Sequence, residues 1–160
     1  MKTLAAALAA FTFTAAVQAQ VTVQEPWVRA TVPRQQATGA FMQLSSAHNA
    51  RLVAAQSPVA GVVEIHEMAM EGDVMKMRAL ADGLPLPAGQ TVQLKPGGYH
   101  IMLMSLKTQI QPGQTVPLTL VVQDANGQRQ SIDVQASVRA LGAQPPGHSP
   151  GHGSHGGMKH

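Results

Sequence analysis

Residues 116–138, VPLTLVVQDANGQRQSIDVQASV, decide the fold class of this chain. Two runs rich in Val, Leu, Ile and Thr, at 116–124 and 129–138, flank the dipeptide Asn126-Gly127. Asn-Gly tolerates the positive φ angles of a type I′ turn, which joins adjacent antiparallel strands. The stretch therefore predicts a β-hairpin.

The same pattern extends over most of the chain. Short runs of β-branched residues and leucine are separated by Gly, Pro and Asn turns, and no helical apolar periodicity persists. Many short strands at this spacing indicate an all-β fold, a small Greek-key sandwich or barrel. The further candidate strands are 21–31, 39–46, 51–56, 61–70, 74–80, 91–94 and 99–106.

The two ends of the chain differ in composition from this β region. Residues 1–19 have the pattern of a cleaved signal peptide, with Lys2, an Ala-rich apolar run, and Val-Gln-Ala at 17–19 for the signal peptidase. That run is shorter than the roughly 20 apolar residues of a membrane span. Residues 143–160 are mostly Gly, Pro, Ser and His, which predicts a disordered tail. We therefore expect an exported, periplasmic protein with one domain, 20–142, and no membrane span after cleavage.

Composition also excludes several classes of function. The chain carries 11 Lys and Arg against 8 Asp and Glu, without a basic cluster and with one Trp and one Tyr, so no nucleic-acid partner is expected. The absence of cysteine excludes disulfides and every thiolate metal site. Any soft metal must therefore be bound by methionine.

Methionine and histidine gather in one part of the sequence, between His66 and His100 and just beyond. The thioether is a soft, neutral donor and imidazole is a good copper ligand, a combination that suits Cu(I) better than zinc, calcium or magnesium. Residues two apart in a strand share a face, so His100 projects with Met102. Six of the nine methionines lie here, at positions 68, 70, 75, 77, 102 and 104.

The turn between the strands at 61–70 and 74–80 decides whether these side chains can meet. A two-residue loop at 71–72 makes His66 and Met77 direct partners. A two-residue loop at 72–73 pairs Met68 with Met77 and leaves His66 as the diagonal neighbour. A three-residue loop would put His66 and Met77 on opposite faces and break the site. The sequence alone permits the site without selecting among these turns.

Other interpretations compete with metal binding. A methionine on a strand more often packs than binds a metal, so Met70, Met75 and Met104 are interpreted as core or supporting residues. His48, alone in a Ser-Ala-His-Asn turn, is interpreted as ordinary surface. The alternative function is a β-sandwich interaction domain whose methionines only pack. No nucleophile–base set or paired acids stand out, so we do not expect an enzyme.

The sequence resembles the periplasmic copper chaperone family called PCu(A)C. The resemblance covers about residues 21–138, and its most specific feature is a His-x₁₀-Met pair followed by His-x-Met. The matching stretches are VEIHEM at 63–68, VMKMR at 74–78 and LKPGGYHIMLM at 94–104, with WVRAT at 27–31, GAFM at 39–42 and VPLTL at 116–120.

This resemblance implies a cupredoxin-like β-barrel and a set of Cu(I) ligands, with Met68 as an alternate ligand. The spacing between the second and third ligands is one residue longer than the family pattern, an insertion that the loop around 83–89 can absorb. The resemblance also implies delivery of copper to the dinuclear copper centre of cytochrome c oxidase subunit II, with thioredoxin-like copper assembly proteins as further partners. Copper sequestration is the rival role. The implied ligands are His66, Met77, His100 and Met102.

The tail at 143–160 extends beyond the minimal family domain. Some family members carry similar His/Met-rich extensions, and flexible imidazole ligation suits Cu(II). The sequence therefore predicts a second, looser copper site that captures Cu(II). Its expected ligands are His148, His152, His155, Met158 and His160.

Overall fold

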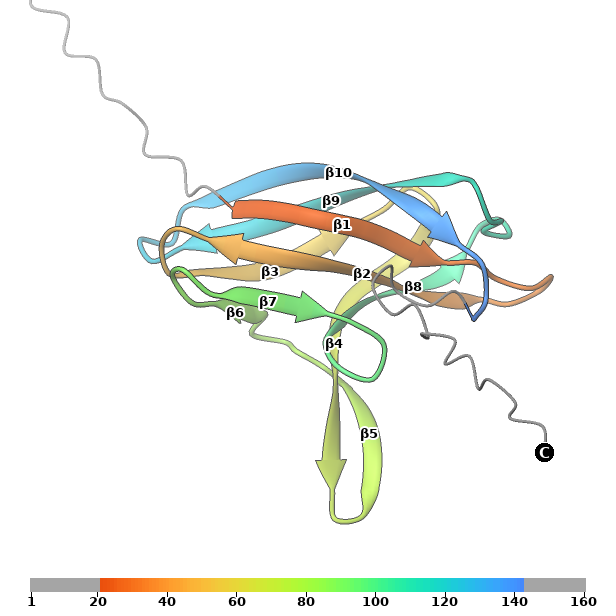
Figure 1. Cartoon of the computed structure of the whole chain (residues 1–160), viewed down its shortest axis with the longest axis horizontal. Coiled ribbons are helices and arrows are strands. Elements are labelled where there is room, and N and C mark those ends of the chain that lie inside the picture. The colour runs from red at the N-terminus through yellow and green to blue at the C-terminus, as the bar shows by residue number, and fades with distance from the viewer. Residues whose placement is uncertain (1–20, 143–160) are drawn as a thin grey trace, which may run out of the picture.

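The computed structural model describes residues 21–142, and this part of the chain contains ten strands and no helix (Figure 1). The prediction of an all-β fold is therefore confirmed. The predicted signal peptide and tail lie outside the described residues. The strands are β1 (Val21–Arg29), β2 (Ala37–Ser46), β3 (Ala50–Gln56), β4 (Ala60–Glu71), β5 (Val74–Ala79), β6 (Leu84–Leu86), β7 (Thr91–Leu94), β8 (His100–Leu106), β9 (Thr115–Asp124) and β10 (Arg129–Arg139).

Nine strands follow one hydrogen-bonded path, β5-β4-β8-β2-β1-β10-β9-β3-β6, and β7 pairs with β2. β1 and β10 are parallel, whereas the other pairs are antiparallel. β2 forks the sheet, because one part of it pairs with β8 and another with β7. Several neighbours along the path are not consecutive in sequence, as expected of a Greek-key arrangement.

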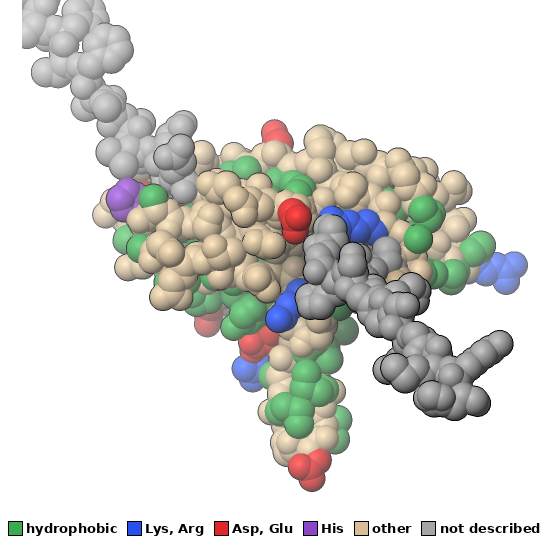
Figure 2. Space-filling view, viewed as in Figure 1, with side chains coloured by type: hydrophobic (Ala, Val, Ile, Leu, Met, Phe, Trp, Pro, Cys, Tyr) green, Lys and Arg blue, Asp and Glu red, His purple; other side chains and the backbone are tan. Residues whose placement is uncertain are grey.

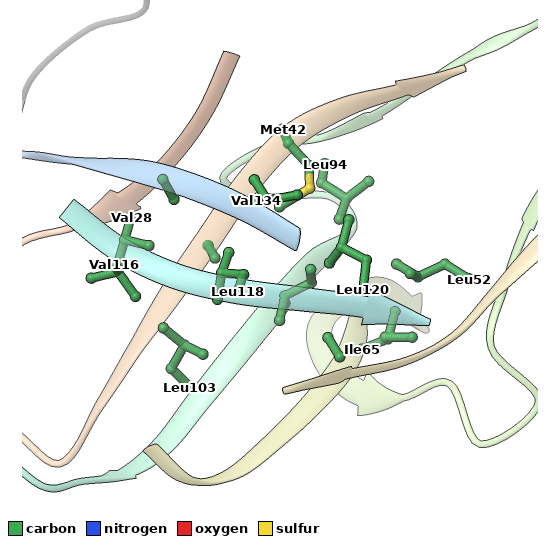
Figure 3. Close-up of a cluster of buried hydrophobic side chains, with 14 of the residues drawn as sticks. Val28, Met42, Leu52, Ile65, Leu94, Leu103, Val116, Leu118, Leu120 and Val134 are labelled. Atoms are coloured by element: carbon green, nitrogen blue, oxygen red, sulfur yellow. The ribbon is translucent and has the colours of Figure 1, made fainter. Parts of the chain in front are cut away.

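The core lies between the curled layers of the sheet. Alternate residues of β9 point inward, so that Leu118 and Leu120 are fully buried. Figure 3 shows these two leucines in one buried cluster with Val28 of β1 and Leu103 of β8. Each such side chain contributes about 1.5–3 kcal/mol on burial, which fixes β8 firmly against the rest of the barrel.

One strand was missing from the predictions. The loop expected around 83–89 contains β6, whose Leu84 and Leu86 are buried. Pro85 between them cannot donate a backbone hydrogen bond, and proline is tolerated because β6 lies at the end of the sheet. Alternation of two leucines around a proline is the signal that indicates this edge strand.

The hairpin predicted at Asn126-Gly127 is present, but its turn is not type I′. β9 and β10 pair in register, and the amide of Gly127 donates to the carbonyl of Asp124 at 3.1 Å. Gly127 has φ +82°, whereas Asn126 is not among the described residues with positive φ. This geometry is a type I turn followed by a left-handed glycine. The Asp124 carboxylate accepts hydrogen bonds from the amides of Asn126 and Gln128 and holds the turn in that form.

The β4–β5 hairpin projects from the body of the molecule (Figure 1). The part of β4 nearest the body pairs with β8, and its distal part pairs with β5 alone. Every residue of β5 is exposed, so this strand contributes nothing to the barrel core. The hairpin places the methionine-rich stretch at the edge of the fold.

Candidate metal centre

β4 and β8 bring two histidines together. His66 and His100 are register partners, and their ring centroids lie 5.7 Å apart in an edge-to-face arrangement. Their neighbours Ile65 and Ile101 point into the core, so the two imidazoles project from the opposite face of the sheet. Both histidines are nevertheless buried, with 8% and 7% of their surfaces exposed.

The turn of the β4–β5 hairpin is a two-residue loop, Gly72-Asp73. It corresponds to the second of the three turns considered from the sequence: Met68 pairs directly with Met77, and His66 pairs with Ala79. Met77 is therefore the diagonal neighbour of His66 on the same face. Gly72 adopts φ +62°, which glycine permits without steric cost.

An open hollow of about 280 Å³ lies beside these residues. Three thioethers and one imidazole line it, those of Met68, Met77, Met102 and His100, and we call this space the hollow from here on. His66 is not part of the lining, and its ring lies behind that of His100, with 5.7 Å between the centroids. Pro96 and Gly97, from the turn before β8, also line the hollow. With residues of β1 and β2 also in the lining, five strands (β1, β2, β4, β5 and β8) thus contribute to the hollow.

Hydrogen bonds leave one nitrogen of each imidazole uncommitted. The Nε2 of His66 lies 2.7 Å from the Glu64 carboxylate, and its Nδ1 is buried without a hydrogen-bond partner. In His100, Nδ1 lies 3.0 Å from the carbonyl oxygen of Gly98. If these nitrogens donate to their oxygen partners, a lone pair remains on Nδ1 of His66 and on Nε2 of His100. The buried Nδ1 of His66, which has no hydrogen-bond partner, and the thioethers that line the hollow are both suited to a soft metal ion such as copper.

The pKa of His100 is lowered from its ordinary value of 6.5. Burial is the largest cause, and the positive charges of His66 and Arg29 lower it further. The hydrogen bond to the Gly98 carbonyl acts in the opposite direction. A neutral imidazole is the form that binds a metal, so this environment favours the ligand form of His100 at neutral pH.

An aromatic wall closes one side of the hollow, and it was not found from the sequence. The Phe41 ring lies 6.4 Å from the His100 ring and stacks on Trp27 at 4.5 Å. It occupies the space above Gly39, where an added Cβ would come within 2.7 Å of the ring. Arg29 lies over the same ring at 5.5 Å. Gly39 and Phe41 are two apart on β2, so they lie on one face of the strand. A glycine that leaves space for a nearby aromatic ring, together with Trp27, is the sequence signal that could have predicted this aromatic wall.

Not every methionine has the expected environment. Met70 and Met75 are 60% and 47% exposed, so a core role for these two is wrong, and the supporting role named as the other possibility stays a prediction. They lie on the projecting hairpin, where no second layer covers them. Met104 is partly buried on β8, and His48 is exposed as expected. Glu64, which contacts His66, is a further residue missed from the sequence, although its Glu-x-His spacing on β4 places both side chains on one face.

Within residues 21–142, no group of three His, Cys, Asp or Glu side chains is placed to hold a metal ion. Beside the imidazole of His100, the soft donors that line the hollow are the thioethers of Met68, Met77 and Met102. The same residues include no helix with the length and apolarity to span a membrane. The tail ligands proposed above, His148 to His160, lie outside the described residues.

Comparison with known sequences identifies related proteins. A family model described as "Putative lipoprotein LpqE-like" matches residues 21–138. The "Putative lipoprotein Lxx21020" of Leifsonia xyli subsp. xyli (strain CTCB07) is 32% identical over 115 residues, which cover 72% of this chain and 69% of that protein.

Solved structures share the fold. CuI-DR1885 from Deinococcus radiodurans is 33% identical, with 77% of this chain and 81% of that chain covered and a TM-score of 0.59. The apo PCuAC domain from PmoF1 is 23% identical, covers 76% of this chain and 94% of that one, and has a TM-score of 0.61. The copper-bound PCuAC domain from PmoF2 has a TM-score of 0.60 at 23% identity, over 76% of this chain and 93% of that one. The cupredoxin-like fold expected from the sequence is confirmed.

Proposed function

This chain belongs to the LpqE-like family, and on that premise we propose that it is a copper chaperone that carries Cu(I) in the hollow. The observation that carries the proposal is the position of two neighbouring cross-strand pairs, His66 with His100 and Met68 with Met77, where the β4–β5 hairpin leaves the barrel. The relative CuI-DR1885, at 33% identity, supports copper as the metal.

The proposed ligands are His66, Met77, His100 and Met102, with Met68 as the alternate. Met68 is the direct partner of Met77, so either sulfur can face the ion, and methionine has the flexibility to exchange. Two imidazoles with thioethers form a soft, neutral donor set, which favours Cu(I) over harder divalent ions. Glu64 lies near this set, but its carboxylate is already engaged with His66.

Release follows from the same chemistry. Neutral thioethers bind copper without the charge of a thiolate, so they exchange readily when a partner offers ligands. Met77 is 47% exposed, which leaves its sulfur accessible to an incoming protein. The proposed role is therefore carriage and handover, with no catalytic step.

The wider role is part of the same proposal. Residues 1–19 would direct export to the periplasm, and 143–160 would capture Cu(II) through the ligands from His148 to His160. After reduction, the ion would occupy the hollow and pass to the dinuclear copper centre of cytochrome c oxidase subunit II. Thioredoxin-like copper assembly proteins would act beside it. Sequestration for copper tolerance uses the same ligands and differs only in the absence of transfer.

Titration of the mature chain with and without residues 143–160 tests this proposal. We expect one Cu(I) bound in both forms, measured anaerobically against a chelator, and Cu(II) binding only when the tail is present. Addition of an oxidase subunit II copper domain should then remove the Cu(I). Failure to bind stoichiometric Cu(I) in either form supports the packing interpretation, and binding without transfer supports sequestration.

A further inference from the structure

The β4–β5 hairpin carries four methionines as two adjacent cross-strand pairs. Met68 is opposite Met77, and Met70 is opposite Met75. Because Met68 and Met70 are two apart on β4, both pairs lie on the same face of the hairpin. We call these four side chains the thioether ladder.

Burial does not account for the outer pair of this ladder. Met42 illustrates a packing methionine, since it is 2% exposed within the core cluster. Met70 and Met75 are 60% and 47% exposed on a strand pair that no second layer covers. Figure 2 shows apolar side chains over the surface of the projecting hairpin, with acidic side chains at its tip. Single exposed apolar residues are common, but Met70, Met75 and Met77 are exposed side by side on one face, and such a patch needs another explanation.

The opposite face of the hairpin contains the charged residues. Arg78 forms an ion pair with Glu67, its register partner, at 2.6 Å, and Lys76 pairs with Glu71. These charges neutralise one another on the face away from the ladder. The ladder therefore offers neutral sulfur alone, a donor set that selects soft monovalent ions and gives little affinity for calcium, magnesium or zinc.

The geometry allows one ion to bind between the outer pair. Directly opposite residues in an antiparallel pair have Cβ atoms about 4.5–5.5 Å apart, and the three rotatable bonds of methionine let both sulfurs turn toward one point. The inner pair, Met68 and Met77, lines the hollow with His100. The outer pair, Met70 and Met75, therefore lies two residues nearer the turn of the hairpin on the same face.

We propose that Met70 and Met75 form an outer Cu(I) position, through which the ion enters and leaves the hollow by way of Met68 and Met77. This inference rests on the proposed function of the hollow. Each step exchanges one thioether ligand for another on the same ion. The copper stays Cu(I) throughout, and no electron or proton is transferred.

Methyl NMR of the full chain with ¹³C-labelled methionine tests the outer position, using Ag(I) as a redox-inert, soft monovalent probe. With the first equivalent we expect the methyl signals of Met77 and Met102 to shift. With further Ag(I), the signals of Met70 and Met75 should shift as a second event. The variant Met70→Leu/Met75→Leu keeps apolar pairs of similar volume but lacks sulfur, so it should lose the second event and retain the first.

Transfer kinetics provide the second readout. Cu(I) release from the double variant to an added chelator should be slower than from the wild type and from Met104→Leu, a control that removes a partly buried thioether on β8 outside the hairpin. Unmoved Met70 and Met75 signals, with a normal first event, would overturn this inference and leave the proposed function intact. Absence of any shift at Met77 and Met102 would instead refute the proposed function, and the outer position with it.

Discussion

His66 and His100 are direct partners across β4 and β8, and their rings meet edge to face at 5.7 Å between centroids. Each ring has one nitrogen near a fixed oxygen, the Glu64 carboxylate for His66 and the Gly98 carbonyl for His100. The pairing therefore holds two imidazoles rigidly beside flexible thioethers. We expect the histidines to determine where copper binds and the methionines to determine how easily it leaves.

The first prediction concerns pH. The pKa of His100 is lowered below 6.5, chiefly by burial and then by the charges of His66 and Arg29, against the hydrogen bond to Gly98. Protons thus compete for this ligand only in acid, so Cu(I) affinity should change little between pH 8 and 7 and fall as the pH drops toward 5. Chelator competition across this range measures the effect, and constant affinity down to pH 5 would contradict it.

The same shift of the His100 pKa affects stability without metal. In the unfolded chain His100 binds its proton at a higher pH than in the fold, so the unfolded state carries more protons just below pH 6.5. Stability from this residue is therefore present above that pH and lost as the pH falls. Urea unfolding of the apo chain should show a shallower decline in acid for His100→Asn than for the wild type.

The second prediction concerns the thioether ligands. Met68→Leu/Met77→Leu and Met102→Leu preserve volume but remove thioether donors, with Met68 included because it can replace Met77, and each should weaken Cu(I) binding by at least about tenfold, since loss of even an outer-shell partner costs that much. Met104→Leu is the matched control, because Met104 lies on the same strand and face as Met102 but does not line the hollow. Chelator competition should leave its affinity unchanged. Equal affinity in all three variants would exclude thioether ligation.

Some of this site could be predicted from the sequence, because strand parity alone assigns side chains to faces. Parity places His100 beside Met102 and His66 beside Met68. It cannot give the register between β4 and β8, since that pairing is determined by how Ile65 and Ile101 enter the core. Only the structure could therefore show that the two histidines face each other.

Turns and edges limited the prediction in other places. Gly72 is compatible with either two-residue loop, so the sequence left the partner of Met77 open until the structure showed it to be Met68. Pro85 concealed β6, because proline is read as a break unless the strand lies at an edge. Exposure of Met70 contradicted a general rule, since methionine usually packs in cores.

The third prediction concerns Glu64, a positioning residue for His66. Its carboxylate at 2.7 Å from Nε2 would keep the proton on that nitrogen and leave Nδ1 for the ion. Glu64→Ala should lower Cu(I) affinity by about tenfold. This is the smallest effect usual for residues that hydrogen-bond a metal ligand, and we expect it because Glu64 is partly exposed. Glu64→Gln retains an acceptor and should lose less.

The tautomer of His66 distinguishes positioning from a general loss of structure. ¹⁵N NMR of the apo chain should show a proton on Nε2 in the wild type and in Glu64→Gln, and a mixture of tautomers in Glu64→Ala. A fully folded Glu64→Ala variant with wild-type affinity and an unchanged tautomer would show that Glu64 has no such role.

The fourth prediction separates backbone strain from steric contact at two glycines that do not line the hollow. Gly83 and Gly89 have similar positive φ values, +78° and +72°. A Cβ at Gly83 would collide with the carbonyl oxygen of Leu52 and lie 3.0 Å from the Cα of Val53, whereas one at Gly89 would meet nothing within 4 Å. Gly89→Ala should therefore cost about 1–2 kcal/mol in stability from the left-handed backbone alone.

Gly83→Ala adds the collision with the β3 backbone to the same strain, so its cost should reach about 2–5 kcal/mol. Urea unfolding of the apo chain gives both values. Because neither glycine lines the hollow, both variants should bind Cu(I) like the wild type wherever they remain folded. Equal losses of stability at the two glycines would show that β3 and β6 can move apart to accept a methyl group. In that case the close approach at Gly83 would not determine how β6 pairs with β3.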